Sequence, residues 1–237
     1  MELCNAMLSF LNDLDTQVLL AINGCHNSYF DIFMYLYSGK WIWIPLYAAI
    51  LYMLFRDFSW RTAFLCTVAI ALVCLFADQV AASLIRPHVE RLRPSNLNNP
   101  ISDLVHIVNN YRSGRYGFPS CHASNTIGLA FYLLLLSRHR VLSWFIFFWT
   151  ILTCYSRIYL GVHYPGDILV GAFIGIVGAV LMYSLFVWVN KKLEAKGMKG
   201  ISHVEFVNPP SKHGFIPVVG GGVILIGITL YSAFCVL

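Results

Sequence analysis

Long apolar runs alternate with short polar connections along this chain, and the pattern predicts a membrane protein built of helices. A helix needs roughly 17 to 25 mostly apolar residues to cross the hydrocarbon core of a bilayer. Six runs come close to that length, at residues 38–55, 62–85, 118–137, 141–156, 167–189 and 215–237. We therefore expect an all-α, polytopic membrane bundle of about six transmembrane helices.

The first part of the chain has a different pattern. From residue 8 onward, apolar positions recur at helical spacing (Leu8, Leu11, Leu14, Val18, Ala21, Ile22), and polar side chains fill the other face (Asn12, Asp13, Asp15, Gln17). This amphipathicity is typical of a helix that lies in the membrane interface. Asn23-Gly24 interrupts it, and a second amphipathic piece begins near Ser28. We predict an interfacial segment over residues 1–37.

The remaining boundaries follow from changes in composition. Residues 38–190 hold five of the runs and form the expected membrane core, and residues 191–213 read as a charged cytoplasmic linker containing Pro209-Pro210. Residues 214–237 form an additional Gly-rich span. One long loop, residues 86–117, is rich in Asn, Arg, Pro and Ser, and we expect it to cap or line a site.

Composition supports the membrane interpretation and excludes other classes. Hydrophobic residues make up 58% of the 237 residues, charged residues 11%, and the mean hydropathy is +0.68. A soluble domain carries roughly 25% charged residues.

The net charge is +5, but the basic residues do not form a solvent-exposed face on which they alternate with aromatic residues, as a nucleic-acid binding surface would require. We therefore expect no nucleic-acid partner. The seven cysteines form no CxxC pair, which argues against a metal centre or disulfide framework. No Lys or Arg precedes Lys40, which argues against a removed signal peptide.

The distribution of Lys and Arg predicts which connections face the cytoplasm. Nine of the sixteen lie in the connections near 56–61, 138–140 and 190–213, and cytoplasmic loops are enriched in these residues. The other seven lie on the opposite side, in or near the stretches that carry candidate chemistry. Both clusters of reactive side chains are therefore expected on the non-cytoplasmic face.

The first such stretch is Phe-Pro-Ser-Cys-His-Ala at residues 118–123, just before an apolar helix. Proline is favoured at the first helical position, so the backbone N–H groups of Ser120, Cys121 and His122 would point out of the helix end toward an anion. The alternative is an ordinary N-terminal cap, because Pro-Ser is common at a helix start.

The second stretch, residues 156–167, reads Ser-Arg-Ile-Tyr-Leu-Gly-Val-His-Tyr-Pro-Gly-Asp. Pro165 can begin the next helix, and a carboxylate at Asp167 can bond one ring nitrogen of His163, leaving the other free to attack. A histidine near a helix end can also be purely structural. Arg157 in the same short loop favours function, because an arginine there without a nearby acid needs an anion.

The third stretch carries Arg86 and Arg93-Pro94. The two arginines are seven residues apart, so we expect both on one face at the end of the second span. We interpret Arg91 and Glu90 as an ion pair exposed to solvent. The alternative for the whole stretch is a basic helix face without a ligand, whose arginines only extend their charged ends into water. Guanidinium forks, a hydroxyl and two imidazoles together fit a phosphate.

Together these residues resemble the type 2 phosphatidic acid phosphatase family, membrane lipid phosphatases that share a site with vanadium-dependent haloperoxidases. The family pattern is Lys, six residues, Arg-Pro; then Pro-Ser-Gly-His; then Ser-Arg, five residues, His, three residues, Asp. The matching positions here are Arg93-Pro94, Pro119, Ser120, His122, Ser156, Arg157, His163 and Asp167. Arg86 departs from the family Lys, and Cys121 departs from the family Gly.

The resemblance implies the roles of these residues. His163 would be the nucleophile that forms a phosphohistidine, with Asp167 orienting it, and His122 would protonate the leaving oxygen and then activate water. Arg86, Arg93, Ser120, Cys121 through its amide, and Arg157 would bind the phosphoryl oxygens. No metal and no cofactor is implied, and no obligate protein partner is evident.

The lipid is left open at this point. The chain looks most like an undecaprenyl pyrophosphate phosphatase in a bacterial inner membrane, with its site facing the periplasm. A lipid A phosphatase or a phosphatidylglycerophosphate phosphatase is the alternative. A protein of another class, which binds or transports a lipid phosphate without turnover, also fits an anion pocket but has no use for two imidazoles.

Overall fold

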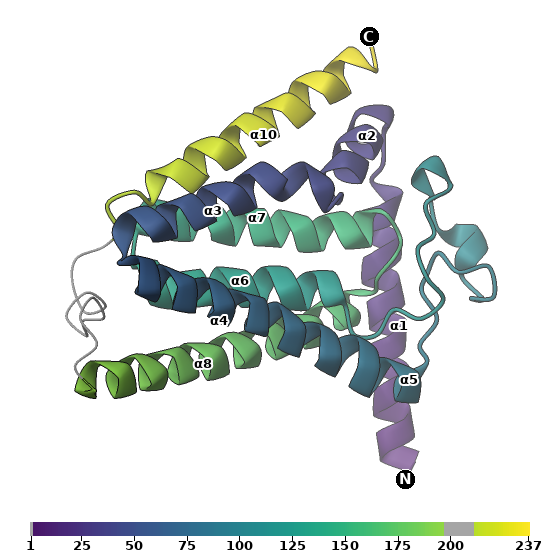
Figure 1. The fold of residues 1–237 in the computed structure, drawn as a ribbon. Coiled ribbons are helices and arrows are strands. Elements are labelled where there is room, and N and C mark those ends of the chain that lie inside the picture. The colour runs from purple at the N-terminus through teal and green to yellow at the C-terminus, as the bar shows by residue number, and fades with distance from the viewer. Residues whose placement is uncertain (1, 197–210) are drawn as a thin grey trace.

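The computed structural model describes residues 2–196 and 211–237, and the long elements in these residues are all helices (Figure 1). In chain order they are α1 (Glu2–Gly24), α2 (Ser28–Tyr37), α3 (Ile44–Asp57), α4 (Trp60–Asp78), α5 (Arg86–Val89), α6 (Cys121–Ser137), α7 (Arg140–Tyr159), α8 (Pro165–Ala195) and α10 (Phe215–Phe234). Short turns of 3-10 helix lie at Trp41–Trp43, Ser102–Leu104 and Val108–Asn110, and a π-helical turn at Gln79–Ile85 joins α4 to α5. The all-α prediction is confirmed.

Among the described residues, four helical stretches are long and apolar enough to cross a membrane: Trp60–Val89, Arg140–Tyr159, Pro165–Ala195 and Phe215–Phe234. The apolar helix α6 has 17 residues. The expected first span at 38–55 needs correction, because α3 begins only at Ile44, with Pro45 in its first turn. It is bent by 65° from α2, so the two count as a fifth span only when taken together.

Helix α6 lies inside the bundle and packs against α4, α7 and α8 (Figure 1). Small residues of α8 let the first turn of α6 pack closely against it. A Cβ on Gly171 of α8 would lie 2.5 Å from the carbonyl oxygen of Ser120, and one on Gly175 would clash with the carbonyl of Ser124. Close backbone approach at small residues is a common way for membrane helices to pack. It fixes the first turn of α6 against α8 at Gly171 and Gly175.

Helix α1 crosses the ends of the bundle helices instead of running along them (Figure 1). Leu19 is fully buried in a small core with Ala123, Ile158 and Ile168, while apolar side chains nearer the N-terminus, such as Met7 and Phe10, are exposed. Because α1 runs across the bundle axis, it lies along the membrane surface when the long helices cross the membrane. This is the arrangement expected of an interfacial amphipathic helix.

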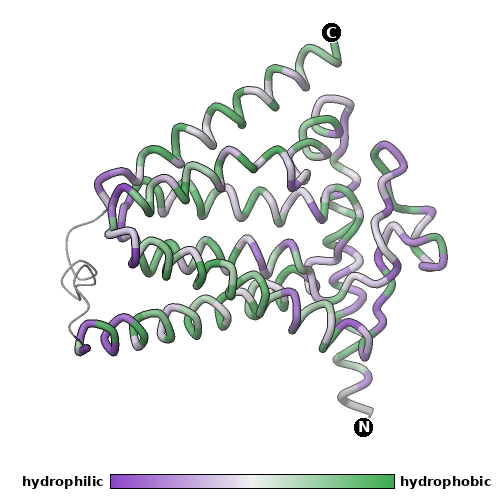
Figure 2. The backbone as a smooth tube through the Cα atoms, viewed as in Figure 1, coloured by the Kyte–Doolittle hydropathy of each residue, from purple (hydrophilic) through white to green (hydrophobic). Residues whose placement is uncertain are grey.

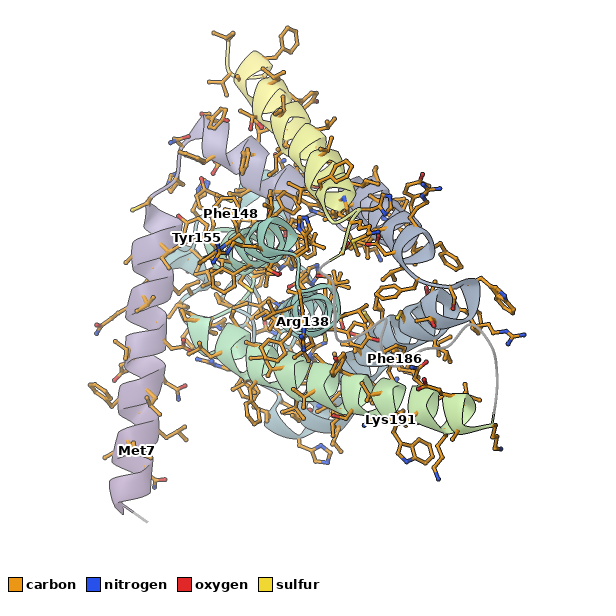
Figure 3. All side chains as sticks on the ribbon, turned by 90° about the vertical axis from the view of Figure 1, so that its left-hand side faces the viewer. Met7, Arg138, Phe148, Tyr155, Phe186 and Lys191 are labelled. Carbon is orange, nitrogen blue, oxygen red and sulfur yellow. The ribbon has the colours of Figure 1, made fainter. Side chains whose placement is uncertain are left out.

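The two ends of the bundle carry different polar groups, and apolar residues fill the region between them (Figure 2). The basic connections 56–61 and 138–140 and the end of α8 lie together at one end. Figure 3 views the molecule from that end, with Arg138 in the α6–α7 connection and Lys191 near the end of α8. The loop 86–117 and α1 lie at the other end. Of the predicted linker 191–213, residues 197–210 lie outside the described part of the chain.

Candidate active site

His163 and Asp167 meet at the turn between α7 and α8. Helix α8 begins at Pro165, as predicted, and Tyr164 caps it. Oδ2 of Asp167 accepts from the backbone N–H of Tyr164 at 3.0 Å and lies 3.2 Å from Nδ1 of His163. Both side chains are almost completely buried, with exposed fractions of 1% for His163 and 0% for Asp167. The helix cap therefore fixes the carboxylate, and the carboxylate fixes the ring.

The other ring nitrogen of His163 faces a cation. Nη1 of Arg93 lies 2.7 Å from Nε2 and also donates to the carbonyl of Val162 at 2.9 Å. A guanidinium group can only donate, so Nε2 must carry a lone pair and Nδ1 must carry the proton given to Asp167. Burial holds the pKa of His163 well below its usual range, and Arg93, Arg157 and Arg86 lower it further. The ring is neutral at neutral pH, which is the form that can attack phosphorus.

Three arginines from separate parts of the chain surround this ring. Arg86 comes from α5, Arg93 from the loop after it, and Arg157 from the last turn of α7. Burial, together with Arg157 and Arg86, lowers the pKa of Arg93 to about 10, which still leaves it charged. The Nε donors of all three are buried without a hydrogen-bond partner in the described residues. Buried hydrogen-bond donors normally have a partner. Three neighbouring arginines with unpaired donors therefore suit the binding of an oxyanion, which would accept these hydrogen bonds and neutralise the positive charge.

Arg157 is held by residues that the sequence analysis did not identify. Its guanidinium donates to the hydroxyl of Ser38 and, at 3.2 Å, to the hydroxyl of Tyr111. Burial acts to raise the pKa of Tyr111, but the charge and hydrogen bond of Arg157, together with Ser113 and Arg93, outweigh it and the net shift is downward. The expectation that Arg157 lies in a loop is wrong, because it belongs to α7 and is only 1% exposed.

The start of α6 differs from the prediction by one residue. Ser120 is the N-cap, and Pro119 precedes it instead of occupying the first helical position. The Ser120 side chain accepts from the N–H of Ala123 at 3.4 Å, and its own N–H donates to the carbonyl of Asp167 at 3.0 Å. Ser120 therefore caps the helix and ties it to α8, and its N–H is not available to an anion. The N–H groups of Cys121 and His122 keep the free position of a helix start.

His122 lies on the first turn of α6, at the same end of the bundle as His163. It is close enough to Arg157, His163 and Arg93 for their charges to act on it. Two imidazoles from distant stretches of the sequence thus share one arginine-lined region. This juxtaposition is what an attacking group and a proton donor on the same phosphate require.

The two departures from the family pattern are in contact with each other. Nη2 of Arg86 donates to Sγ of Cys121 at 3.0 Å and to the carbonyl of Pro119 at 2.8 Å. A thiol is a weak acceptor, and glycine in its place would offer none. The longer, forked arginine therefore has a partner that the family pair of Lys and Gly would lack.

Arg86 and Arg93 do not share one helix face, which corrects the prediction. Helix α5 ends at Val89, and Glu90 adopts a left-handed conformation with φ of 49°, so the chain turns before Arg93. The loop then returns through a bridge between Leu92 and Tyr116. Arg93 approaches His163 from this loop. The two guanidinium groups come from different elements.

The interpretation of Arg91 and Glu90 as a solvated pair is also wrong. Arg91 donates to Oδ1 of Asp167 at 3.0 Å, pairs with Asp15 of α1 at 2.7 Å and lies over the ring of Tyr164 at 3.9 Å. Asp15 in turn accepts from the N–H of Gly166 at 2.6 Å. Arg91 and Asp15 are thus missed residues of the site. Asp15 stood on the polar face of an amphipathic helix, where an acidic residue gave no distinguishing signal.

Comparison with known proteins identifies the family. A family model described as PAP2 superfamily matches residues 67–191, more than half of the chain. The chain belongs to the PAP2 superfamily. Its predicted membership is confirmed, and with it the class of activity: the protein is a membrane phosphatase that acts on lipid phosphates.

Relatives of known name support this assignment over nearly the whole length. A lipid A 4'-phosphatase of Bacteroides thetaiotaomicron is 47% identical over 226 residues, covering 95% of this chain and 98% of that protein. A second lipid A 4'-phosphatase, from Porphyromonas gingivalis, is 32% identical and covers 78% of each chain. The crystal structure of Aquifex aeolicus LpxE is similar in fold, with a TM-score of 0.55 and 22% identity, covering 72% of this chain and 95% of that one.

Proposed function

We propose that this PAP2 phosphatase is a lipid A 4'-phosphatase that works through a phosphohistidine on His163. The observation that supports the phosphohistidine mechanism is the neutral ring of His163, with Asp167 at one ring nitrogen and Arg93 at the other. The support for lipid A is the identity of 47% with a phosphatase of that name along nearly the full length of both chains. Undecaprenyl pyrophosphate, which the sequence analysis put first, is the less supported substrate.

In the first half of the reaction, Nε2 of His163 attacks phosphorus and the bond to the sugar oxygen breaks. His122, held in its charged form by the phosphate dianion bound beside it, gives its proton to that oxygen, which leaves as a hydroxyl. As Nε2 becomes bonded, the ring acquires positive charge, and Asp167 at 3.2 Å from Nδ1 stabilises it. Arg93 must release Nε2 before attack, and its guanidinium then binds a phosphoryl oxygen.

In the second half, His122 removes a proton from water, the water oxygen attacks phosphorus, and the nitrogen–phosphorus bond breaks. Inorganic phosphate leaves, and His163 returns to the neutral tautomer with its proton on Nδ1. Arg86, Arg157 and the N–H groups of Cys121 and His122 neutralise charge on the equatorial oxygens in both steps. The role we assign to Ser120 is indirect, because its side chain and its N–H are used within the protein.

We further propose that the protein lies in the inner membrane of a bacterium, with this site on the periplasmic face. The support is the separation of charges along the bundle. The basic connections 56–61 and 138–140 lie at the end opposite the site, as expected for cytoplasmic connections. Helix α1 would then lie on the periplasmic surface beside the phosphate group of the lipid.

The test is phosphate release by purified protein from lipid A with both phosphates, undecaprenyl pyrophosphate and phosphatidylglycerophosphate, each with EDTA or with Mg²⁺. Mass spectrometry of the lipid A product would locate the lost phosphate. We expect loss from the 4' position, unchanged by EDTA. Preference for undecaprenyl pyrophosphate, or loss from the 1 position, would contradict the substrate proposal.

A His163→Ala variant serves as the blank and separates catalysis from binding. We expect no turnover by this variant and low-concentration inhibition of the parent enzyme by orthovanadate, which mimics five-coordinate phosphorus. Undiminished release by His163→Ala would refute the mechanism. Lipid binding without any release by the parent protein would favour a binding or transport protein.

A further inference from the structure

A second cluster of chemically active side chains lies at the same end of the molecule, outside the phosphate site. His26 follows α1, Asp31 lies in the first turn of α2, and His106 lies in the long loop. Each offers one ligand atom, and these three atoms lie within 4.8 Å of one another. These three residues cannot be recognised as possible metal ligands in the sequence, because they are 5 and 75 positions apart and come together only in the fold.

The geometry of the cluster is tight. Nε2 of His106 lies 2.9 Å from Oδ2 of Asp31, and the rings of His26 and His106 stack with centroids 3.6 Å apart and an angle of 3° between their planes. His106 and Asp31 are partly buried, with exposed side-chain fractions of 28% and 20%, and His26 is exposed. The cluster is therefore open to an ion from solvent, and its ligand atoms are near enough for side-chain rotation to bring them around one.

Neighbouring residues fix the backbone of His106 and the side chain of Asp31. Asn23 accepts from the N–H of His106 at 2.7 Å and donates to the carbonyl oxygens of His106 and Tyr159 at 3.0 and 2.7 Å. The hydroxyl of Tyr159 donates to Oδ1 of Asp31 at 2.7 Å. Metal ligands that are held by hydrogen bonds from neighbouring residues bind an ion more tightly than unrestrained side chains do, because they lose less conformational entropy on binding.

The ligand set selects the kind of metal. Two imidazoles and one carboxylate suit Zn²⁺ and other first-row transition ions, whereas Mg²⁺ and Ca²⁺ prefer oxygen ligands only. Zinc binds nitrogen and oxygen at about 2.0 to 2.2 Å and takes four ligands, so three side chains and one water complete its shell. We propose that His26, Asp31 and His106 form a zinc site that fastens the α1–α2 connection to the long loop.

The position of this zinc site connects it to the phosphate site without making it part of the chemistry. Tyr159 follows Arg157 by two residues, and His106 precedes Tyr111, which bonds Arg157, by five. An ion at the cluster would tie the loop to the α1–α2 connection, and the bond from Tyr159 to Asp31 would extend this link to the end of α7. We therefore expect zinc to stabilise the fold, with the phosphohistidine chemistry itself independent of it.

The experiment uses full-length protein purified with a histidine-free tag, stripped with a chelator and dialysed. Zinc, magnesium or calcium is then titrated in by calorimetry, bound metal is counted by elemental analysis, and thermal unfolding is recorded with and without zinc. We expect one zinc per chain and a thermal midpoint that rises with free zinc, because a ligand that binds only the folded state stabilises it. Magnesium and calcium should give neither effect.

The matched variants are His26→Ala and His88→Ala. Both histidines are exposed, and His88 lies on α5 at the same end of the molecule but outside the cluster. Because His26 is exposed, its loss should leave the fold intact while abolishing the zinc-dependent rise in midpoint and the stoichiometric zinc. His88→Ala should keep both. Absence of zinc binding by the parent protein, equal zinc binding by His26→Ala, or equal loss in both variants would overturn the proposal.

Discussion

Arg91 donates from Nη1 to Oδ1 of Asp167 at 3.0 Å, on the oxygen that does not face His163. The same guanidinium pairs with Asp15 through Nη2 at 2.7 Å. Asp167 is therefore held from two sides, by the Tyr164 N–H on one oxygen and by Arg91 on the other. Helix α1 is fastened in this way to the carboxylate that contacts His163, the proposed nucleophile. Arg91 is a positioning residue in this arrangement, because it acts through Asp167.

Replacing Arg91 should lower the rate of the chemical step more than it lowers substrate binding. Arg91→Ala leaves Asp167 buried with one of its bonds missing, and a shift of about 1 Å in a reacting group can cost about 10²-fold in rate. We expect kcat to fall by roughly 10- to 100-fold, with KM nearly unchanged and Arg91→Lys partly restoring the rate. Arg115→Ala is the control, since Arg115 is an exposed arginine of the same loop. A larger effect on KM than on kcat would assign Arg91 to substrate binding.

What the sequence predicted well depended on local spacing. His163 and Asp167 are four residues apart, on either side of the proline that begins α8, so their contact forms locally at the start of the helix. The apolar runs also predicted the helices, because length and hydropathy are local properties. The amphipathic pattern of α1 predicted a helix there, and its place at the membrane surface stays a prediction.

What the sequence could not predict depended on distant contacts. Arg91 meets Asp167 across 76 positions, and Arg157 meets Ser38 across 119. The helical spacing of Arg86 and Arg93 was misleading, because the helix ends at Val89 and the turn at Glu90 cannot be seen in an apolar pattern. The first helical residue of α6 was misplaced for a similar reason, since both Pro119 and Ser120 are favoured near a helix start.

Gly117 should not tolerate a side chain, because it packs against the His163–Asp167 pair. A Cβ there would lie 3.1 Å from both Cγ of Arg93 and Oδ2 of Asp167, and 3.5 Å from Nδ1 of His163. We expect Gly117→Ala to lower kcat by about 10-fold or more and to destabilise the fold by about 1 to 3 kcal/mol. Gly114→Ala is the matched control, since a Cβ there meets nothing within 4 Å. Equal activity of the two variants would show that the pair has room to move.

Arg86 and Cys121 should behave as a coupled pair in a double-mutant cycle. Their contact at 3.0 Å joins the two departures from the family pattern, so restoring only one family residue breaks it. We expect Arg86→Lys and Cys121→Gly each to lower kcat/KM, and the double variant to be more active than the product of the single effects predicts. Residues in contact typically show coupling of about 0.5 to 3 kcal/mol. Arg86→Lys combined with Cys25→Ser, at an exposed cysteine after α1, should show none.

The acidic side of the pH profile should respond to Arg93. His163, the proposed nucleophile, would work as the neutral ring, and burial followed by Arg93, Arg157 and Arg86 lowers its pKa, which extends the neutral form to lower pH. Removing one cation raises that pKa, so the acidic limb of kcat/KM should move to higher pH in Arg93→Gln. The ionisation of the substrate phosphate, with a pKa near 6, affects both enzymes alike and cancels in the comparison. An unchanged limb would mean that another group sets it.

The contribution of His122 should depend on what leaves phosphorus. An alcohol of the lipid A sugar is a poor leaving group and needs a proton as the bond breaks, whereas p-nitrophenolate or a phosphate group leaves readily without one. General acid catalysis typically contributes about 10²- to 10⁴-fold. We therefore expect His122→Ala to reduce phosphohistidine formation on that scale with lipid A, and by much less with p-nitrophenyl phosphate. Breakdown of the intermediate should slow equally for both, since the water step is shared. Single-turnover measurements separate the two steps. Equal loss in the first step with both substrates would assign His122 to phosphate binding and leave the proton of the leaving group to another donor.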